Sequence, residues 1–334
     1  MYLIAVGAAL PGEPIDNETL AQYVPVNSEW IELFIGTRTR HLVTDLATGE
    51  VRATLTDLCT HAAQQAMNEA GLQPGDIDFL VLGTATPDQL MPATVNLVAE
   101  RLGVNMVPTY QVQSGCAGAI QALDIGRLLL AGGLGTGLVM GGDVCRKHLV
   151  LGHEARTLSS RELVNYVLFG DGAGATVVSA APTTGATEVT ALVNQLTGLG
   201  RPPGQVVDWF GRAEDPTSRP AFSEDYKAIE QHVPVMAVEI VGQLLDEAGW
   251  TADDISFILP PQLSGRMTAV IVDRLGLPAA KDVSCVGVTG NTGNALPFLQ
   301  LRELLELLQP GDRALAVAVE SSKWIKAGLA LEGR

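Results

Sequence analysis

Basic residues are scarce in this 334-residue chain, which has 21 Lys and Arg against 37 Asp and Glu and a formal net charge of −16. It contains no basic run and no stripe of interleaved aromatic and basic residues. A nucleic acid, whose phosphates require positive charge, is therefore not expected as a partner.

Cysteine and long apolar runs are scarce as well. The four cysteines lie far apart without a CxxC pair, so neither a disulfide framework nor a metal site is expected; they are Cys59, Cys116, Cys145 and Cys285. The first residues, MYLIAVGAALPGE, lack the charged lead-in of a signal peptide, and no segment approaches the roughly 20 apolar residues of a membrane span. These features indicate a cytoplasmic protein that does not bind membranes.

Two stretches of the chain, residues 64–103 and 242–276, resemble each other. Both read as an amphipathic helix ending in EAG, an acidic D-I-x-F entry into an apolar strand, and a second helix ending in RLG. The Gly of EAG precedes the Asp of D-I-x-F by five residues in each copy, at Gly71 and at Gly249. Since 47% of the residues are hydrophobic, the chain can bury a large core, and we expect two duplicated α/β halves packed face to face.

Cys116 lies within QVQSGCAGAIQALDIG, residues 111–126. The preceding residues read as a short strand, and the apolar spacing after Gly118 predicts a helix. A thiol at such a corner faces backbone N–H groups and the helix dipole, which are expected to lower its pKa and make it a nucleophile. The alternative is a small buried cysteine that fills a gap in the core, but the small flanking residues let another molecule approach.

The second copy of the repeat places an asparagine opposite this cysteine. Cys116 follows Gly103 by 13 residues, and the corresponding distance after Gly276 leads to Thr289–Asn291 in VGVTGNTGNALP. Asparagine among glycines is by itself typical of a turn. Because the two corners are expected to meet at the interface of the halves, where ligand sites tend to form, Asn291 is a candidate site residue.

The stretch 181–222 is rich in Pro and Gly and is expected to be an irregular connection, either a lid or an ordinary crossover. The predicted domains are therefore a first half at 1–180 with the nucleophile, this connecting segment, and a second half at 223–334 with the asparagine loop.

Along nearly its whole length the sequence resembles the ketoacyl-acyl-carrier-protein synthase III family of the thiolase superfamily. The resemblance is carried by NSEWIELFIGTRTRH, TATPDQLMPATVNLVAERLG, SGCAGAIQAL, LFGDGAGATVV and VGVTGNTGNALP. It implies an α/β thiolase fold with αβαβα layers, a homodimer, and acyl transfer through a cysteine thioester. It also implies acyl-CoA or a carrier protein's acyl-phosphopantetheine as substrate, with no permanently bound cofactor.

The resemblance assigns roles to individual residues. Cys116 would be the nucleophile and would supply one N–H of the oxyanion hole, while Ser321 or Ser322 would supply the other, with Ser322 taken as the site residue. Leu90 and Met91 would reach into the partner's acyl tunnel. Trp30 is the retained tryptophan of the early tryptophan–arginine segment.

Several positions depart from the family pattern. The family's His-Gln-Ala-Asn stretch reads LPPQLSGR here, so that Pro261 replaces the histidine that assists decarboxylation and Ser264 replaces the asparagine. Of the Cys–His–Asn set only Cys116 and Asn291 remain. Phe34 stands where an arginine that grips coenzyme A is expected. Pro261, Ser264 and Phe34 are accordingly taken as altered substrate-binding positions.

These departures predict an acyltransferase that loads an acyl group on Cys116 and passes it to an oxygen, nitrogen or sulfur nucleophile in natural-product biosynthesis. Losing a donor to a developing oxyanion typically costs 10²–10³-fold in rate, and proline offers neither a side-chain donor nor an N–H. Arg266 corresponds to a basic position that family members use against acidic carrier proteins, so a carrier is favoured over coenzyme A as the acyl donor. A solvated surface arginine is the alternative for this residue.

Two other functions stay open. One is a decarboxylative ketoacyl synthase that recruits another residue, and the other is a non-catalytic acyl-binding or heterodimer subunit. An alcohol or amine acceptor usually needs a base, and the candidates are His148, His153, His232, Glu320 and, less favoured, His41. The acyl group, the acceptor and the pathway are not determined by the sequence.

Overall fold

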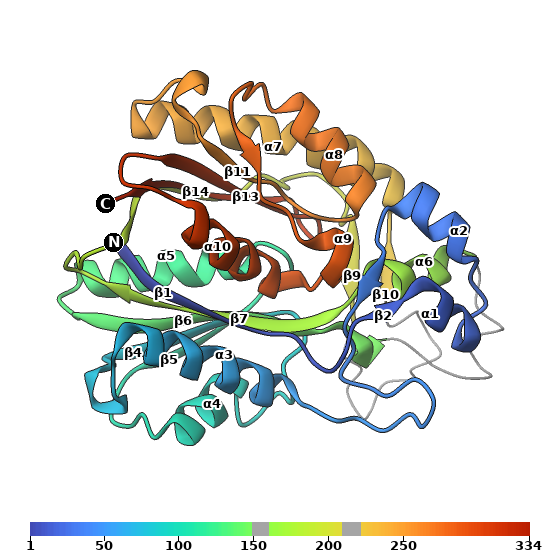
Figure 1. Cartoon of the computed structure of the whole chain (residues 1–334), viewed down its shortest axis with the longest axis horizontal. Helices are drawn as coiled ribbons and strands as arrows, with labels where there is room; N and C mark the ends of the chain where they lie inside the picture. Colours follow the sequence, from blue (N-terminus) through green and yellow to red (C-terminus); the bar gives the residue numbers. More distant parts are fainter. Residues whose placement is uncertain (149–159, 209–221) are drawn as a thin grey trace.

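The computed structural model describes residues 1–148, 160–208 and 222–334. Five layers alternate between helices and sheets (Figure 1). Helices α3 (Leu55–Ala70) and α4 (Thr94–Leu102) form one outer layer, and α7 (Tyr226–Ala248) and α8 (Gly265–Arg274) form the other. The expected αβαβα arrangement is confirmed.

The strands of the two halves follow the same spatial order. The first sheet runs β5-β4-β6-β7-β1, with β1 Tyr2–Ala9, β4 Phe79–Thr84, β5 Thr109–Gln113, β6 Thr136–Val144 and β7 Asp171–Ser179. The second runs β12-β11-β13-β14-β8, with β8 Thr187–Leu196, β11 Phe257–Leu259, β12 Lys281–Asp282, β13 Arg313–Glu320 and β14 Ile325–Gly333. Numbered along the chain within each half, both orders are third, second, fourth, fifth, first, which confirms the predicted duplication.

The repeated sequence motifs mark equivalent helix ends. The glycines of the two EAG motifs and the two RLG motifs all adopt positive φ angles, between 68° and 72°, just after a helix; they are Gly71, Gly249, Gly103 and Gly276. This left-handed conformation is one that glycine adopts at no steric cost. The short sequence similarity therefore reflects matched helix stops in the two halves.

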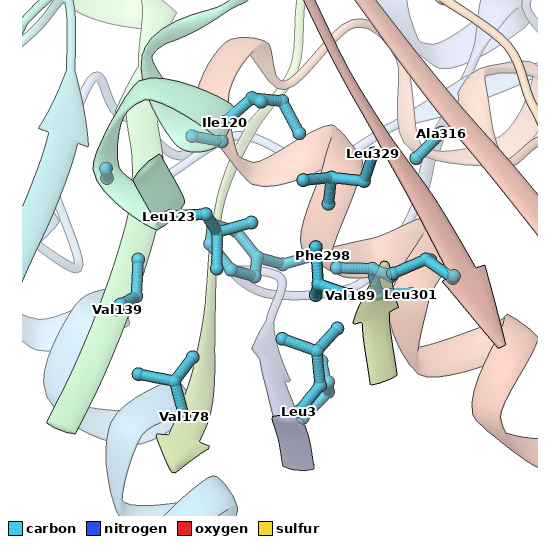
Figure 2. Packing of buried hydrophobic residues seen from close by; sticks show 14 of the residues in the cluster. Leu3, Ile120, Leu123, Val139, Val178, Val189, Phe298, Leu301, Ala316 and Leu329 are labelled. Atoms are coloured by element: carbon cyan, nitrogen blue, oxygen red, sulfur yellow. The ribbon is translucent and has the colours of Figure 1, made fainter. Parts of the chain in front are cut away.

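The central layer consists of α5 (Gly118–Ala131) and α10 (Leu296–Leu307), one from each half. Figure 2 shows Leu123 of α5 and Phe298 of α10 among side chains from both sheets. The packing is close, because a Cβ atom on Gly174 of β7 would lie 2.2 Å from Cβ of Phe298. Burial between two sheets positions the start of α5, and with it Cys116.

Shorter elements gather at one end of the layers and cover the site (Figure 1). They are β2 (Ile15–Asp16), α1 (Asn17–Tyr23), α2 (Ser28–Trp30), η1 (Ile31–Ile35), β3 (Thr39–Arg40), α6 (Ser160–Leu168), β9 (Gln205–Val207) and β10 (Phe222–Glu224). None of the helices within the described ranges has the length and apolar character needed to cross a bilayer.

The structure differs from the sequence prediction within the stretch 181–222. This stretch contains β8, a ten-residue strand that pairs with β14 along its length and with β1 at Tyr2 and Leu3. The side chains of Thr187, Val189, Ala191 and Val193 alternate into the interior. The period-2 pattern of a strand was therefore present, although the surrounding prolines and glycines suggested an irregular crossover.

Candidate active site

Cys116 lies at the corner between β5 and α5, as expected. The Gly118 N–H donates to the Gly115 carbonyl at 2.8 Å, which closes the turn just before the helix. A Cβ atom on Gly83 of the neighbouring strand would lie 2.4 Å from the Gly118 carbonyl oxygen, so this glycine allows the helix start to approach the sheet. The corner is held close to the sheet with its thiol partly exposed.

Asn291 lies at the equivalent corner of the second half, after the short helix α9 (Val286–Thr289). Its backbone is fixed on both sides, because its N–H donates to the Leu168 carbonyl and its carbonyl accepts from Gly170. Its side-chain Oδ1 accepts from the Gly293 N–H at 3.0 Å. Asn291 and Cys116 line the same cavities, which is the arrangement that the repeat predicts, and the distance between their side chains stays a prediction.

Asp143, at the end of β6, joins the two corners. Its Oδ1 accepts from the backbone N–H groups of Ala85 and Thr86 and from the hydroxyls of Thr84 and Thr86. Its Oδ2 accepts from the N–H and the Nδ2 of Asn294, and the same Nδ2 donates to the Ser114 carbonyl, two residues before Cys116. This buried network makes the second half a support for the first.

Two neighbouring cavities contain Cys116. They share six residues, namely Cys116, Ile229, Leu263, Asn291, Gly293 and Ser321. The first cavity continues along the covering elements, where it is lined by Phe169, Phe222 and Ile229 and by the polar side chains of Asn165, Gln205 and Glu224. The second continues between the halves along Pro260, Pro261 and Leu296. Both an apolar chain and polar groups can therefore approach the thiol.

The expectation of a lowered thiol pKa is wrong. Burial raises the pKa of Cys116 well above its usual value, and the negative charges of Glu320, Asp143 and Glu224 raise it further. The helix start offers N–H groups, but three carboxyl groups around the thiol outweigh them. At neutral pH the resting side chain is the thiol, and loading an acyl group requires it to lose a proton.

Glu320 is the carboxyl group that lies beside this corner. It follows the last buried residues of β13, is 1% exposed, and accepts from the Ser322 N–H through Oε1 at 2.7 Å. Its Oε2 lies against Gly115, where a Cβ atom would come within 2.2 Å of it. Burial raises the pKa of Glu320, while the N–H groups of Ser322, Cys116 and Ala117 act in the opposite direction.

The predicted oxyanion hole is altered by this carboxyl group. The Ser322 N–H donates to Glu320 rather than facing the cavity of Cys116, and Ser322 lines a separate pocket. Ser321 lines both cavities at Cys116. Of the two serines offered by the sequence, Ser321 is therefore the better placed to supply a backbone donor beside Cys116.

Pro261 lines the second cavity together with Cys116 and Asn291. The adjacent Gln262 is engaged with Cys285 and Val286: its Oε1 accepts from both N–H groups, and its Nε2 lies 3.9 Å from the Cys285 Sγ. The Ser264 hydroxyl accepts from the Met267 N–H and caps α8, and its contact with substrate stays a prediction. The position of the missing histidine thus offers no proton donor to the cavity.

Trp30, Phe34 and Arg266 form an exposed group outside the cavities. The rings of Trp30 and Phe34 stack with centroids 5.9 Å apart, and the Arg266 guanidinium lies 5.9 Å from the Phe34 ring. Arg266 also donates to the Leu33 carbonyl at 3.3 Å. The structure therefore brings the predicted carrier-docking arginine onto the residue that replaces the expected coenzyme-A arginine.

Leu90 and Met91 lie on the loop between β4 and α4 and are 71% and 86% exposed. Within one chain they line neither cavity at Cys116, and their contact with a partner's pocket stays a prediction. Lys147, a cation on the same side as this loop, is engaged within the chain: its Nζ donates to the carbonyls of Thr86 and Pro87 and forms an ion pair with Asp88.

The two histidine candidates whose side chains the structure describes, His41 and His232, are engaged with other groups. His232 packs edge-on against Trp324, and His41 lies with Nδ1 3.1 Å from the Pro11 carbonyl oxygen. His148 ends a 3₁₀ turn, η3 (Cys145–His148), its side chain being outside the described residues, as is all of His153. Glu320 is the base candidate that the structure places at the nucleophile.

Four residues of the site were missed at the level of sequence: Asp143, Asn294, Cys145 and Glu224. Asp143 interrupts the apolar strand TGLVMGGDV, and a charged residue there is a signal that was available. Asn294 stands three residues after Asn291 in the same loop. Nothing near Cys145 or Glu224 in the sequence indicates that they line the cavity of Cys116.

Comparison with known proteins shows the family of this chain. The family model described as 3-oxoacyl-[acyl-carrier-protein] synthase III matches residues 110–194, and its C-terminal model matches 245–322. The β-ketoacyl-[acyl-carrier-protein] synthase III of Neisseria meningitidis serogroup B is 33% identical over 294 residues, which cover 86% of this chain and 85% of that protein. The chain belongs to the ketoacyl-acyl-carrier-protein synthase III family, and its fold is the thiolase fold.

Among solved structures, the tetronic acid condensing enzyme AbyA1 is similar at 53% identity, with 99% of each chain covered and a TM-score of 0.96. The priming β-ketosynthase of the R1128 polyketide pathway is similar at 27% identity, covering 99% of this chain and 95% of that chain, with a TM-score of 0.85. The chain is thus an enzyme of a transferase and condensing family with relatives in biosynthetic pathways.

Proposed function

We propose that this enzyme takes an acyl group from a carrier-protein thioester onto Cys116 and passes it to a nucleophile without decarboxylation. The observation that carries this proposal is Pro261 in the cavity that Cys116 and Asn291 share. Taking up an acyl group needs the Cys116 thiol to lose its proton and needs backbone donors for the developing oxyanion, and this corner places the thiol beside the N–H groups of a helix start. Decarboxylation of a malonyl extender needs a donor for the developing enolate, and proline has none.

The similarity to a tetronic acid condensing enzyme supports this proposal and extends the predicted acceptor. A tetronic acid ring contains an ester oxygen, so its assembly includes acyl transfer to a hydroxyl group, as the sequence predicts for a heteroatom acceptor. It also contains a new carbon–carbon bond. A carbon between two carbonyl groups is acidic already, so it forms that bond without losing carbon dioxide and without the missing histidine.

A carrier protein is the donor that the exposed group favours. Phe34 covers one face of Trp30 by stacking on it, and Arg266 lies over Phe34 rather than free for a nucleotide phosphate. An arginine at the rim contributes to docking of an acidic carrier through local charge, even though the whole chain carries −16.

A homodimer is proposed as the working form. Leu90 and Met91 are large apolar side chains exposed on one loop, and burial in a partner would remove this surface from water. Light scattering should give twice the 35.1 kDa of one chain, and a monomer at micromolar concentration would contradict this part of the proposal.

The experiment that tests the function is intact-mass analysis of the enzyme after incubation with acetyl, hexanoyl and acetoacetyl thioesters of N-acetylcysteamine. The expected result is one acyl group per chain that hydroxylamine removes and that Cys116→Ala abolishes. If no thioester labels the enzyme, or if the Cys116→Ala variant is labelled equally, the proposal fails.

A further inference from the structure

A small polar pocket lies beside the catalytic cavities. Its walls are Ala85, Gln113, Ser114, Gly115, Gln205, Val207, Glu320 and Ser322. Four of these residues, namely Ala85, Gly115, Gln205 and Val207, also line the first cavity of Cys116. A molecule in the polar pocket therefore lies next to an acyl group carried by the thiol.

Glu320 supplies the carboxyl group of this pocket. It is 1% exposed, and its Oε2 forms no hydrogen bond of good geometry with the groups that the structure describes, although the N–H groups of Cys116 and Ala117 lie close enough to lower the pKa of the carboxyl group. Leaving a buried acceptor unsatisfied costs about 1–3 kcal/mol, and more when the group is charged. Because an ionised carboxylate has about four acceptor sites and the Ser322 N–H occupies one, Glu320 has capacity for a ligand's donor.

The carboxyl group also opposes ionisation of the nucleophile, since its negative charge raises the pKa of Cys116. A purely structural side chain at this place would be expected to stabilise the thiolate or to leave it unchanged. Instead, a group that opposes loading lies where a second substrate would meet the loaded acyl group. This arrangement fits a carboxylate that acts in the second step of the reaction, the transfer of the acyl group to the acceptor.

We propose that the polar pocket binds the hydroxyl group of the acceptor and that Glu320 is the base for its attack. The hydroxyl oxygen forms a bond to the thioester carbonyl carbon, and its proton moves to a carboxylate oxygen of Glu320. The carbon–sulfur bond then breaks, and the sulfur of Cys116 takes up the proton from Glu320. The step consumes one thioester, forms one ester and restores both residues.

The chemistry of the pocket selects among the acceptors that the proposed function leaves open. An ammonium group would form an ion pair with Glu320 and stay protonated, so it would bind without reacting. A hydroxyl group has no charge to be trapped and cannot react at neutral pH without a base. The inference rests on the proposed function and narrows its acceptor to an alcohol.

The test uses full-length enzyme loaded with acetoacetyl N-acetylcysteamine and freed of excess thioester. Methyl glycolate is added as the hydroxyl probe and glycine methyl ester as the amine probe, and the loss of the acyl mass and the ester or amide formed are followed. The wild type should transfer to methyl glycolate faster than to the amine. In Glu320→Gln this transfer should fall about 100-fold, as expected for loss of a general base, while loading persists.

The matched control is Glu239→Gln, a carboxyl group of α7 whose side chain is 53% exposed and pairs with Lys326. It should load and transfer like the wild type. Glu320→Asp, which keeps the charge but withdraws the carboxylate by one methylene, serves if the Gln variant does not fold. It should also load the acyl group and transfer it at least tenfold more slowly.

A fall of less than tenfold in Glu320→Gln, or in Glu320→Asp where the Gln variant does not fold, overturns the inference. So does a wild type that transfers to the amine in preference to the hydroxyl, although the proposed function survives both results. If the wild type takes up none of the thioesters at Cys116, the proposed function itself fails and the inference fails with it.

Discussion

The corner at Cys116 and the corner at Asn291 occupy equivalent places in the two halves, yet they carry different chemistry. The first keeps its nucleophile between small residues at the start of α5. The second keeps the asparagine, but the neighbouring strand end contributes Pro261 where the family has a histidine. The first half keeps the cysteine that is proposed to load the acyl group, whereas the second half lacks the histidine that the family uses to decarboxylate an extender.

In the proposed function this difference separates the two half-reactions of a thiolase-fold enzyme. Loading depends on one corner and its backbone donors, and the fate of the acyl group depends on what surrounds it. The second half has lost a neutral donor at Pro261 and has placed a carboxyl group, Glu320, beside the nucleophile. Around the nucleophile, this chain therefore has the carboxyl group of Glu320 as a proton acceptor and no histidine proton donor at position 261.

The largest effect is expected when the nucleophile of the first corner is removed. Cys116→Ala should abolish the acyl adduct and turnover, because no other thiol has the same position at a helix start facing both cavities. Cys145, which shares the first cavity, is the matched control, and Cys145→Ala should keep the adduct. Intact-mass spectra of both variants check this, and a normal adduct on Cys116→Ala would contradict the role of the residue.

The next largest effect is expected when Asp143, which connects the two corners through hydrogen bonds, is removed. Asp143→Ala leaves the N–H groups of Ala85 and Asn294 without their acceptor, and should lower the free energy of unfolding by about 3 kcal/mol or more. Urea unfolding measures this loss. Glu50→Ala, at an exposed surface position, should change stability by less than about 0.5 kcal/mol; equal losses in the two variants would contradict the bridging role.

A smaller effect concerns the acidity of the nucleophile. Since Glu320, Asp143 and Glu224 raise the pKa of Cys116, its alkylation by iodoacetamide should increase with pH through a midpoint above that of an ordinary thiol. Removing one negative charge in Glu320→Gln lowers this pKa, so alkylation at pH 7 should become faster, by about tenfold. An unchanged or slower reaction would show that Glu320 does not oppose ionisation of the thiol.

The smallest effect lies outside both corners. Arg266→Ala should raise the KM for a carrier-bound acyl thioester by up to about fivefold, as expected for one exposed charge, with little change for an N-acetylcysteamine thioester. Arg274→Ala, on the same helix, is the control. Equal changes for the two thioesters would indicate that Arg266 acts on the acyl group and not on the carrier.

Much of the fold could be predicted from the sequence because the duplicated halves repeat their helix stops. The glycines that end the EAG and RLG motifs mark left-handed positions, and such positions are specified locally. The strand at Thr187–Leu196 was missed because prolines and glycines on both sides masked a short period-2 pattern. The prolines and glycines favoured an irregular segment over the alternation of a strand. The pairing with β14, which stabilises the strand, cannot be read from the local sequence.

The site could be predicted in part. Cys116 and Asn291 were found because each lies at a corner with a local signature, and the structure lets them line common cavities. The thiol pKa could not be predicted, because the carboxyl groups that raise it come from Asp143, Glu224 and Glu320, which are far apart in the sequence. The capping role of Ser264 was not predicted, because a helix cap and a substrate contact look alike in a motif.

The central claim is that the enzyme transfers its acyl group without decarboxylation, and one measurement tests it most directly. Enzyme carrying an acyl group on Cys116 is mixed with labelled malonyl thioester, and carbon dioxide and ketoacyl product are followed over time. Because Pro261 offers no donor to the developing enolate, we predict that neither carbon dioxide nor ketoacyl product forms, while a hydroxyl acceptor still discharges the enzyme. Release of carbon dioxide with ketoacyl product, at a rate approaching that of a histidine-containing family member, would contradict the account.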